Sequence, residues 1–265
     1  MQKTIMITGA TDGIGLETAR MLARQGHNLI IHGRNLDKLA DVKKMLAAIS
    51  TGGNLTSYPG DFSNLKDVKE LGAAVAQDHT RLDVLINNAG VFRVQNPATR
   101  EGLDLRFAVN AIAPYVLTKK LLFLFCLSGR IINLSSAAQA PVDTAALAGP
   151  PRLPEGEAYA QSKLALTMWS CHMGLTLKEK GPAVIAVNPA SFLGSKMVKE
   201  AYGIDGKDLG IGADIFCRAA LSHEFASASG RYFDNDSKRF SSPHPDALND
   251  LKCKTIIQTI ESVLA

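Results

Sequence analysis

The stretch ITGATDGIGLETA, residues 7–19, follows a short apolar run and opens an amphipathic one. A buried strand, a glycine-rich turn and a helix in this order are the context of a dinucleotide-binding unit. Glycines at Gly9, Gly13 and Gly15 let the backbone come close to a pyrophosphate, and the helix N-terminus offers N–H donors and a positive dipole end. A glycine-rich turn needed only for tight packing is the alternative, and the strand–turn–helix context favours the dinucleotide.

The rest of the chain continues this alternation of short apolar and longer amphipathic segments. It predicts an α/β fold: a Rossmann-type, doubly wound parallel sheet with helices on both faces, in a single domain over 1–265. A loop excursion is expected at 137–156 and a substrate-side segment at 190–212, with Ser63 as the N-cap of the third helix. Expected strands are 4–8, 28–32, 55–58, 84–87, 130–134 and 184–188, and expected helices are 13–25, 36–49, 65–77, 103–127, 157–180 and 251–263.

Composition narrows the class of protein. The chain has 265 residues, 46% hydrophobic and 20% charged, with a net charge of +4 and no block of like charges, so no nucleic-acid partner is expected. Four widely spaced cysteines without a Cys-x-x-Cys pair suggest neither a metal site nor a disulfide framework, and a reducing, cytoplasmic location is the expectation. No membrane span is expected, because Lys119 and Lys120 interrupt the most apolar stretch, 115–127.

A second motif lies in EAYAQSKLAL, residues 157–166, where Tyr159 and Lys163 stand four residues apart. On a helix this spacing places both side chains on one face. Alone the pair is weak, since a half-buried tyrosine beside a solvated lysine is common.

Several motifs in chain order resemble those of the short-chain dehydrogenases/reductases. TGxxxGxG is matched at Thr8–Gly15, NNAG at Asn87–Gly90, and YxxxK at Tyr159 and Lys163, and the likeness runs from Lys3 to about Val198. The lengthened loop before Tyr159 and the stretch EGLDLRFAVN, residues 101–110, are similar to the retinol-dehydrogenase-like and protochlorophyllide-reductase-like branch, whose members tend to take apolar carbonyls or alcohols.

The resemblance implies a catalytic set of Ser136, Tyr159, Lys163 and Asn110. Tyr159 would exchange a proton with the substrate oxygen, and the Lys163 cation would lower the tyrosine pKa from its ordinary value of about 10. Ser136 would hydrogen-bond the same oxygen, with Ser135 as its competitor, and Asn110 would hold a water near Lys163. The alternative for Asn110 is a hydrogen bond to neighbouring backbone.

The predicted cofactor is NADP(H), with NAD(H) the less favoured choice. The second strand ends in IIHGRN, which lacks the carboxylate that receives the ribose hydroxyls of NAD, whereas the Arg34 guanidinium can bind a 2′-phosphate. No metal is expected. The expected cofactor-binding residues are Gly9, Thr11, Asp12, Gly13, Ile14, Gly15, Arg34, Asn35, Asp61, Phe62, Asn88, Ala89, Gly90, Tyr159, Lys163, Pro189 and Ser195.

One departure from the family pattern follows Pro189, where Ala190 replaces the usual glycine. Together the motifs predict an NADP(H)-dependent oxidoreductase acting on a small-molecule carbonyl or alcohol. The alternatives are a non-enzymatic dinucleotide sensor, an enzyme that reduces an activated C=C bond, and a nucleotide-sugar epimerase or dehydratase, whose glycine spacing differs. The family suggests a homodimer or homotetramer through the helices at 103–127 and 157–180, unless the lengthened loop covers that face.

Overall fold

The computed structural model describes all 265 residues and contains one sheet of eight strands. Its order is β3-β2-β1-β4-β5-β6-β7-β8, and every neighbouring pair is parallel except β7 and β8. The reversal of strand order between β1 and β4 is the hallmark of a doubly wound sheet, so the predicted fold class is confirmed. The strands are β1 Thr4–Ile7, β2 Asn28–Gly33, β3 Leu55–Pro59, β4 Leu82–Asn87, β5 Phe125–Leu134, β6 Ala183–Asn188, β7 Tyr232–Asp234 and β8 Arg239–Ser241.

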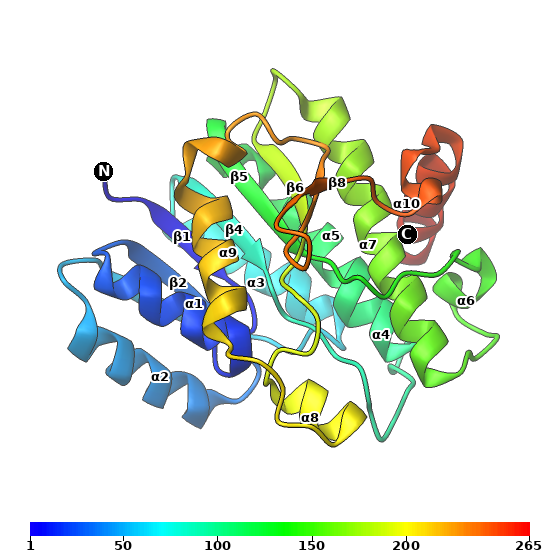
Figure 1. Cartoon of the computed structure of the whole chain (residues 1–265), viewed down its shortest axis with the longest axis horizontal. Helices are drawn as coiled ribbons and strands as arrows, with labels where there is room; N and C mark the ends of the chain where they lie inside the picture. Colours follow the sequence, from blue (N-terminus) through cyan, green and yellow to red (C-terminus); the bar gives the residue numbers. More distant parts are fainter.

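Helices cover both faces of the sheet and bury two separate apolar cores (Figure 1). On one face lie α1 (Gly13–Arg24), α2 (Leu36–Ile49) and α9 (Gly210–Leu221). On the other lie α3 (Leu65–Asp78), α5 (Ala113–Leu121), α7 (Glu155–Leu177) and α10 (Asp250–Leu264). Burial on both faces explains why β4 and β6 are apolar throughout most of their length.

The single long helix predicted at 103–127 is wrong. The structure has α4 (Leu105–Phe107), a π-helical turn at Ala108–Ile112, α5 and a short 3₁₀ turn, and the chain then enters β5 at Phe125. Phe125 pairs with Leu82, but the register then shifts, so that Arg130 is the partner of Val84. Gly129 permits this bulge, because a Cβ there would lie 2.8 Å from the Phe125 ring.

Smaller boundaries also differ from the predictions. Asn64, not Ser63, caps α3, since its side chain accepts a hydrogen bond from the Lys66 amide. The excursion at 137–156 is not all loop, because Asp143 caps the short helix α6 (Thr144–Ala148) and α7 already begins at Glu155. The segment at 190–212 contains α8 (Lys196–Tyr202) and the start of α9. Besides α6, the elements α8, α9, β7 and β8 had no predicted counterpart.

The C-terminal helix α10 packs along α7, with α6 beside it (Figure 1). Cys253, Ile256 and Ile260 of α10 are buried in the same core as Leu166 and Trp169 of α7. The side of α7 that faces away from the sheet is therefore occupied by the chain's own C-terminal helix.

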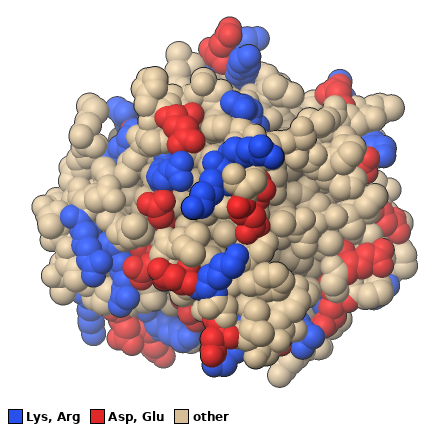
Figure 2. All heavy atoms as spheres, in the orientation of Figure 1, with Lys and Arg blue, Asp and Glu red and all other residues tan.

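The surface carries mixed charge. On the face seen in Figure 2, lysines and arginines lie among aspartates and glutamates rather than in one basic area. Leu105–Leu124 is long and apolar enough to cross a membrane, but 78% of its most apolar window is buried inside the fold, as in the core helix of a globular protein.

Candidate active site

The glycine turn after β1 has no room for a side chain at Gly9 or Gly15. Gly9 adopts φ +65°, and a Cβ on it would lie 2.9 Å from the Ala89 Cα. A Cβ on Gly15 would lie 2.3 Å from the Asn88 amide nitrogen and 2.4 Å from the Gly9 carbonyl oxygen. Because these glycines carry no side chain, the turn and the N-terminus of α1 form a cradle of backbone, which fits the pyrophosphate of a dinucleotide.

The NNAG segment holds this cradle in place. The Asn88 side chain donates to the carbonyl oxygens of Thr8 (2.9 Å) and Gly9 (3.0 Å). The Thr8 hydroxyl accepts from the amides of Asn88 and Ala89, both at 3.0 Å. Gly90 turns toward the catalytic side, where a Cβ would lie 3.6 Å from the Lys163 Nζ. Asn88, Ala89 and Gly90 therefore join the glycine turn to the Tyr159 helix.

His32 is a buried side chain that sequence analysis did not identify. Its Nδ1 accepts from the Gly9 amide (3.3 Å), its Nε2 bonds the Gly60 carbonyl oxygen (3.0 Å), and its ring stacks on Phe62 at 4.4 Å. Burial lowers its pKa to about 4, although the Gly60 carbonyl and Asp61 oppose the shift. A histidine at the end of a strand carries no local signal for such a role.

The low pKa of His32 makes stability dependent on pH. Because the unfolded chain binds this proton near pH 6.5 and the folded one only near pH 4, the contribution of His32 is complete above pH 6.5 and is lost as the pH falls toward 4. The loss is roughly 3 kcal/mol. Urea unfolding of wild type and His32→Gln at pH 7 and pH 4 measures it as the difference between the two pH dependences. Equal pH dependences would contradict the assignment.

The end of β2 lies against the glycine turn. A Cβ on Gly33 would lie 2.5 Å from the Thr11 methyl group, which places the next residue, Arg34, beside that turn. Arg34 is exposed and forms no hydrogen bond or ion pair within the chain. The Asn35 side chain caps α2 by accepting from the Lys38 amide (2.8 Å), and the Lys38 Nζ lies 3.9 Å from Asp12. Asp37 in the first turn of α2 adds a second carboxylate, so the neighbourhood of Arg34 carries mixed charge.

Other predicted cofactor residues serve the local structure as well. Asp12 caps α1 by accepting from the Gly13 amide, and Ile14 lies against the backbone of Gly212 in α9. Asp61 accepts from the Ser63 amide at 2.9 Å, while Phe62 is buried. Each of these residues lies at the carboxyl end of a strand or at the start of the following helix.

Ser136, Tyr159 and Lys163 meet at the carboxyl end of β5. The Lys163 Nζ donates to the Leu134 carbonyl oxygen (2.8 Å) and lies 5.7 Å from the centre of the Tyr159 ring. Burial raises the pKa of Tyr159, while a hydrogen bond with Ser136 works in the opposite direction. Ser135 instead points inward, where its hydroxyl bonds that of Thr167 at 2.7 Å. The geometry therefore favours Ser136 over its competitor.

The expected lowering of the Tyr159 pKa by Lys163 is not found. Burial dominates and raises the phenol pKa, and burial also lowers the pKa of Lys163 to about 7. The lysine therefore loses part of its charge at neutral pH, which weakens its effect on the phenol. In this state Tyr159 keeps its proton and is suited to donate it.

Asn110 lies in the π-helical turn, and both its Oδ1 and its Nδ2 bond the backbone of Val91. Its Oδ1 accepts from the Val91 amide (2.8 Å), and its Nδ2 donates to the Val91 carbonyl oxygen (2.9 Å) and to the Ser162 hydroxyl (3.0 Å). The side chain is thus used to anchor the loop after NNAG, which is the alternative left open by the sequence. A π-turn leaves a helix carbonyl free, and such turns occur often at functional sites.

The segment after β6 completes the site. Pro189 is buried, and the Ser195 hydroxyl caps α8 by accepting from the Val198 amide. A Cβ on Gly13 would lie 3.8 Å from the Ser195 Cβ, so Ser195 lies beside the glycine turn. Ala190 adopts φ +112°, a backbone conformation that favours glycine. The alanine at this position is therefore held in a strained backbone conformation.

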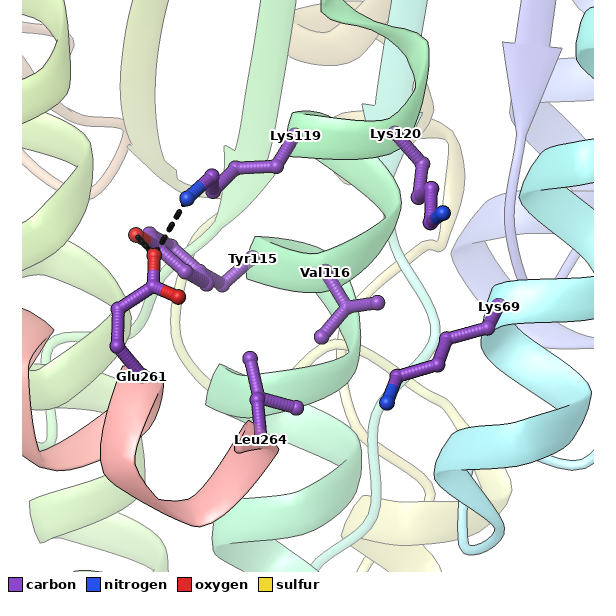
Figure 3. Close-up of a pocket in the computed structure, with 7 residues that line it drawn as sticks. All are labelled: Lys69, Tyr115, Val116, Lys119, Lys120, Glu261 and Leu264. Carbon is purple, nitrogen blue, oxygen red and sulfur yellow. Dashed lines mark hydrogen bonds and ion pairs between the residues drawn. The ribbon is translucent and has the colours of Figure 1, made fainter.

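Aromatic rings extend from Tyr159 toward the surface. The Phe92 ring lies 4.6 Å from that of Tyr159 and 6.2 Å from that of Tyr202, and Phe192 lies 5.3 Å from Tyr202. Sequence analysis did not identify this ladder, because its members come from segments far apart in the chain: the loop after β4, α7, the turn before α8 and the end of α8. A distinct surface cavity of about 270 Å³ lies between α3, α5 and α10, and Tyr159 is not among the residues that line it (Figure 3).

Comparison with known proteins places these features in a family. Residues 3–203 match the family model described as short chain dehydrogenase. Human retinol dehydrogenase 13 is 31% identical over 92% of this chain and 79% of its own length. Human polyprenol dehydrogenase is 29% identical over 89% of the chain and 78% of its own.

Solved structures share the fold. A protein from Mycobacterium paratuberculosis, 23% identical, matches with a TM-score of 0.80 over 99% of this chain and 93% of its own. A metagenomic short-chain oxidoreductase in complex with NADP, 26% identical, matches with a TM-score of 0.63 over 85% of this chain and 94% of its own.

Proposed function

Because this chain belongs to the short-chain dehydrogenase family, and within it to the branch of the retinol dehydrogenases, we propose that it is an NADP(H)-dependent carbonyl reductase or alcohol dehydrogenase. The observation that carries the proposal is the meeting of Ser136, Tyr159 and Lys163 beside the glycine cradle. Oxidoreductase chemistry on an alcohol or carbonyl is the activity in the names of the curated relatives.

The residues divide the work around one substrate oxygen. When bound, the nicotinamide supplies or accepts the hydride. In the reducing direction the Tyr159 hydroxyl donates its proton to the carbonyl oxygen, and its raised pKa keeps that proton available. Ser136 hydrogen-bonds the same oxygen as negative charge develops on it. The Lys163 Nζ lies 5.7 Å from the centre of the ring, and its positive charge stabilises the phenolate that forms when the proton leaves.

Two observations support NADP(H) over NAD(H). Arg34 is exposed, free of protein partners and placed beside the Thr11 side of the glycine turn, and no carboxylate ends β2. A guanidinium without a partner is available for a 2′-phosphate. Several solved relatives of the same fold are NADP complexes.

The aromatic ladder supports an apolar substrate. Phe192 and Tyr202 are each about half exposed, at 48% and 56%, and they connect through Phe92 to Tyr159. Exposed aromatic rings that lead to a catalytic group favour a ligand with a long apolar body. Retinol and polyprenols, named in two relatives, have this shape.

A direct assay tests the proposed function. NADPH oxidation is measured with a panel of apolar aldehydes, ketones and quinones, with NADH as the parallel cofactor. The proposal expects turnover of at least one aldehyde or ketone with NADPH. Tight NADPH binding without turnover on any member would favour the dinucleotide sensor instead.

Assembly gives a further expectation. The face of α7 that would form a helix-to-helix dimer is buried against α10, and His172 of α7 also bonds Asp250 of α10 at 3.0 Å. We expect a monomer of 28.3 kDa by light scattering at micromolar concentration, because a dimer through α7 would have to displace α10. A mass twice as large would contradict this expectation.

A further inference from the structure

The turn after β6 holds a residue in a conformation that its type disfavours. Ala190 has φ +112°, and a non-glycine residue in this region requires support from its surroundings. The turn lies between two parts of the candidate site. On one side the Ser135 amide bonds the Val187 carbonyl oxygen (2.9 Å), and on the other Ser195 approaches Gly13.

The support comes from the hairpin between β7 and β8, some 45 residues further along the chain. The Asp236 carboxylate accepts from the Ser191 amide (2.9 Å) and from the Ser191 hydroxyl (2.6 Å). The Asn235 side chain donates to the Pro189 carbonyl oxygen (3.0 Å). Ala190 is therefore held from both of its neighbours.

A third residue ties the hairpin to the end of β6. The Asn188 side-chain Nδ2 donates to the carboxylates of Asp234 (2.8 Å) and Asp236 (3.0 Å), and the Asn235 backbone N–H donates to the Asn188 carbonyl oxygen (3.1 Å). We name Asp234, Asn235 and Asp236 the hairpin clamp.

The two carboxylates of the clamp are ionised, and Asp236 is exposed. Burial raises the pKa of Asp236, but hydrogen bonds from Ser191 and Asn188 and the charge of Lys207 outweigh it, so the pKa lies below its ordinary value. Asn235 is buried, with 7% of its surface exposed. Hydrogen bonds to an ionised carboxylate are among the stronger ones in a protein, and they can balance a strained backbone torsion.

The same hairpin also touches the serine loop. The Tyr232 hydroxyl donates to the Ser136 carbonyl oxygen (3.3 Å), and Gln139 donates to that oxygen at 2.8 Å. One hairpin thus contacts both the proton-transfer side and the turn that faces the glycine cradle.

We propose that Asp236 and Asn235 are positioning residues for the dinucleotide: they hold Ala190 in its strained conformation and so set the backbone from Pro189 to Ser191 against the bound cofactor. The proposal rests on the proposed function, because it assumes that a nicotinamide dinucleotide binds along the cradle. Neither residue touches the reacting atoms in this account.

A double-mutant cycle between Asp236 and Ala190 tests the proposal. In Asp236→Ala the carboxylate that holds Ser191 is lost, so we expect the Ala190 turn to relax toward negative φ. The dissociation constant for NADPH should then rise by about tenfold. Glycine accepts the native torsion without support. Ala190→Gly alone therefore changes the constant by no more than about twofold, and in the Ala190→Gly background Asp236→Ala costs only about two- to threefold. The constants are measured from NADPH fluorescence without substrate.

Hydrogen exchange supplies a readout that needs no cofactor. The Ser191 amide is protected in wild type by its bond to Asp236, and in Asp236→Ala it exchanges faster, while amides of β6 keep their protection. Ser242→Ala is the matched control, since Ser242 is exposed just after the hairpin and its side chain forms no hydrogen bond with Asp234, Asn235 or Asp236. It is expected to leave the NADPH constant unchanged.

Several outcomes would overturn the proposal. They are an unchanged NADPH constant in Asp236→Ala, an equal loss from Asp236→Ala in the wild-type and Ala190→Gly backgrounds, or an unchanged exchange rate at Ser191. If Asp236→Ala does not fold, Asp236→Asn keeps one acceptor and is expected to show a smaller loss with the same rescue by Ala190→Gly. If wild type binds neither NADPH nor NADH, the proposed function fails instead.

Discussion

Tyr159→Phe is expected to lower kcat by about 10²- to 10⁴-fold, the usual contribution of a general acid or base. Only the hydroxyl is removed, so the phenyl ring keeps its contact with Phe92 and the lysine keeps its bond to the Leu134 carbonyl oxygen. The dissociation constant for NADPH should therefore change by less than about threefold. Steady-state kinetics and NADPH fluorescence measure the two quantities separately.

Tyr115→Phe is the matched control for this change. Its hydroxyl bonds Glu261 in the surface cavity between α3, α5 and α10, which no residue of the glycine turn lines (Figure 3). Loss of that hydroxyl should leave kcat near the wild-type value. A Tyr159→Phe enzyme that keeps most of its kcat would contradict the assignment of the proton donor.

Arg34→Ala is expected to raise the KM for NADPH by roughly ten- to a hundredfold and to leave that for NADH almost unchanged. A hydrogen bond to a charged group contributes about 1.5–3 kcal/mol, and each ~1.4 kcal/mol is tenfold in affinity. Because Arg34 has no partner within the chain, its removal costs no internal contact. Arg34→Asp should go further and reverse the preference, since it repels the phosphate and accepts from the ribose of NADH.

Arg24→Ala controls for the loss of one positive charge. Arg24 is exposed at the last turn of α1, the end opposite to the glycine turn. The Arg24→Ala variant should leave the ratio of kcat/KM for NADPH to kcat/KM for NADH unchanged. Preference for NADH in wild type, or an unchanged ratio in Arg34→Ala, would remove the main support for NADP(H).

The fold was predictable where the signal is local. The strands from β1 to β4 and β6 were expected to within two residues. Burial on both faces makes β1, β2, β4 and β6 short apolar runs, whereas β3 is only partly buried. The start of β5 was missed, since Phe125–Leu127 continues an apolar helical pattern and only its pairing with Leu82 makes it a strand. The strands β7 and β8 have three residues each, too few for a periodic signal.

The candidate site, like the fold, was predictable only where its signal is local. Ser136, Tyr159 and Lys163 were predicted from short motifs in a fixed order, and the structure brings the three residues together. His32, Asn235 and Asp236 were missed, because each acts on a segment far away in the chain: Gly60, Pro189 and Ser191. The pKa of Tyr159 could not be judged from the Lys163 spacing, since burial of both groups decides it.

Deuterium transfer tests the central claim most directly. Wild-type protein is incubated with NADPH carrying deuterium at the transferable position of the nicotinamide, together with an apolar enal that offers both a carbonyl and an activated C=C bond. Mass spectrometry then locates the label. The account predicts deuterium on the former carbonyl carbon, in an allylic alcohol, with no transfer in Tyr159→Phe. A saturated aldehyde with deuterium on a carbon of the former C=C bond would contradict the account and would indicate C=C reduction instead.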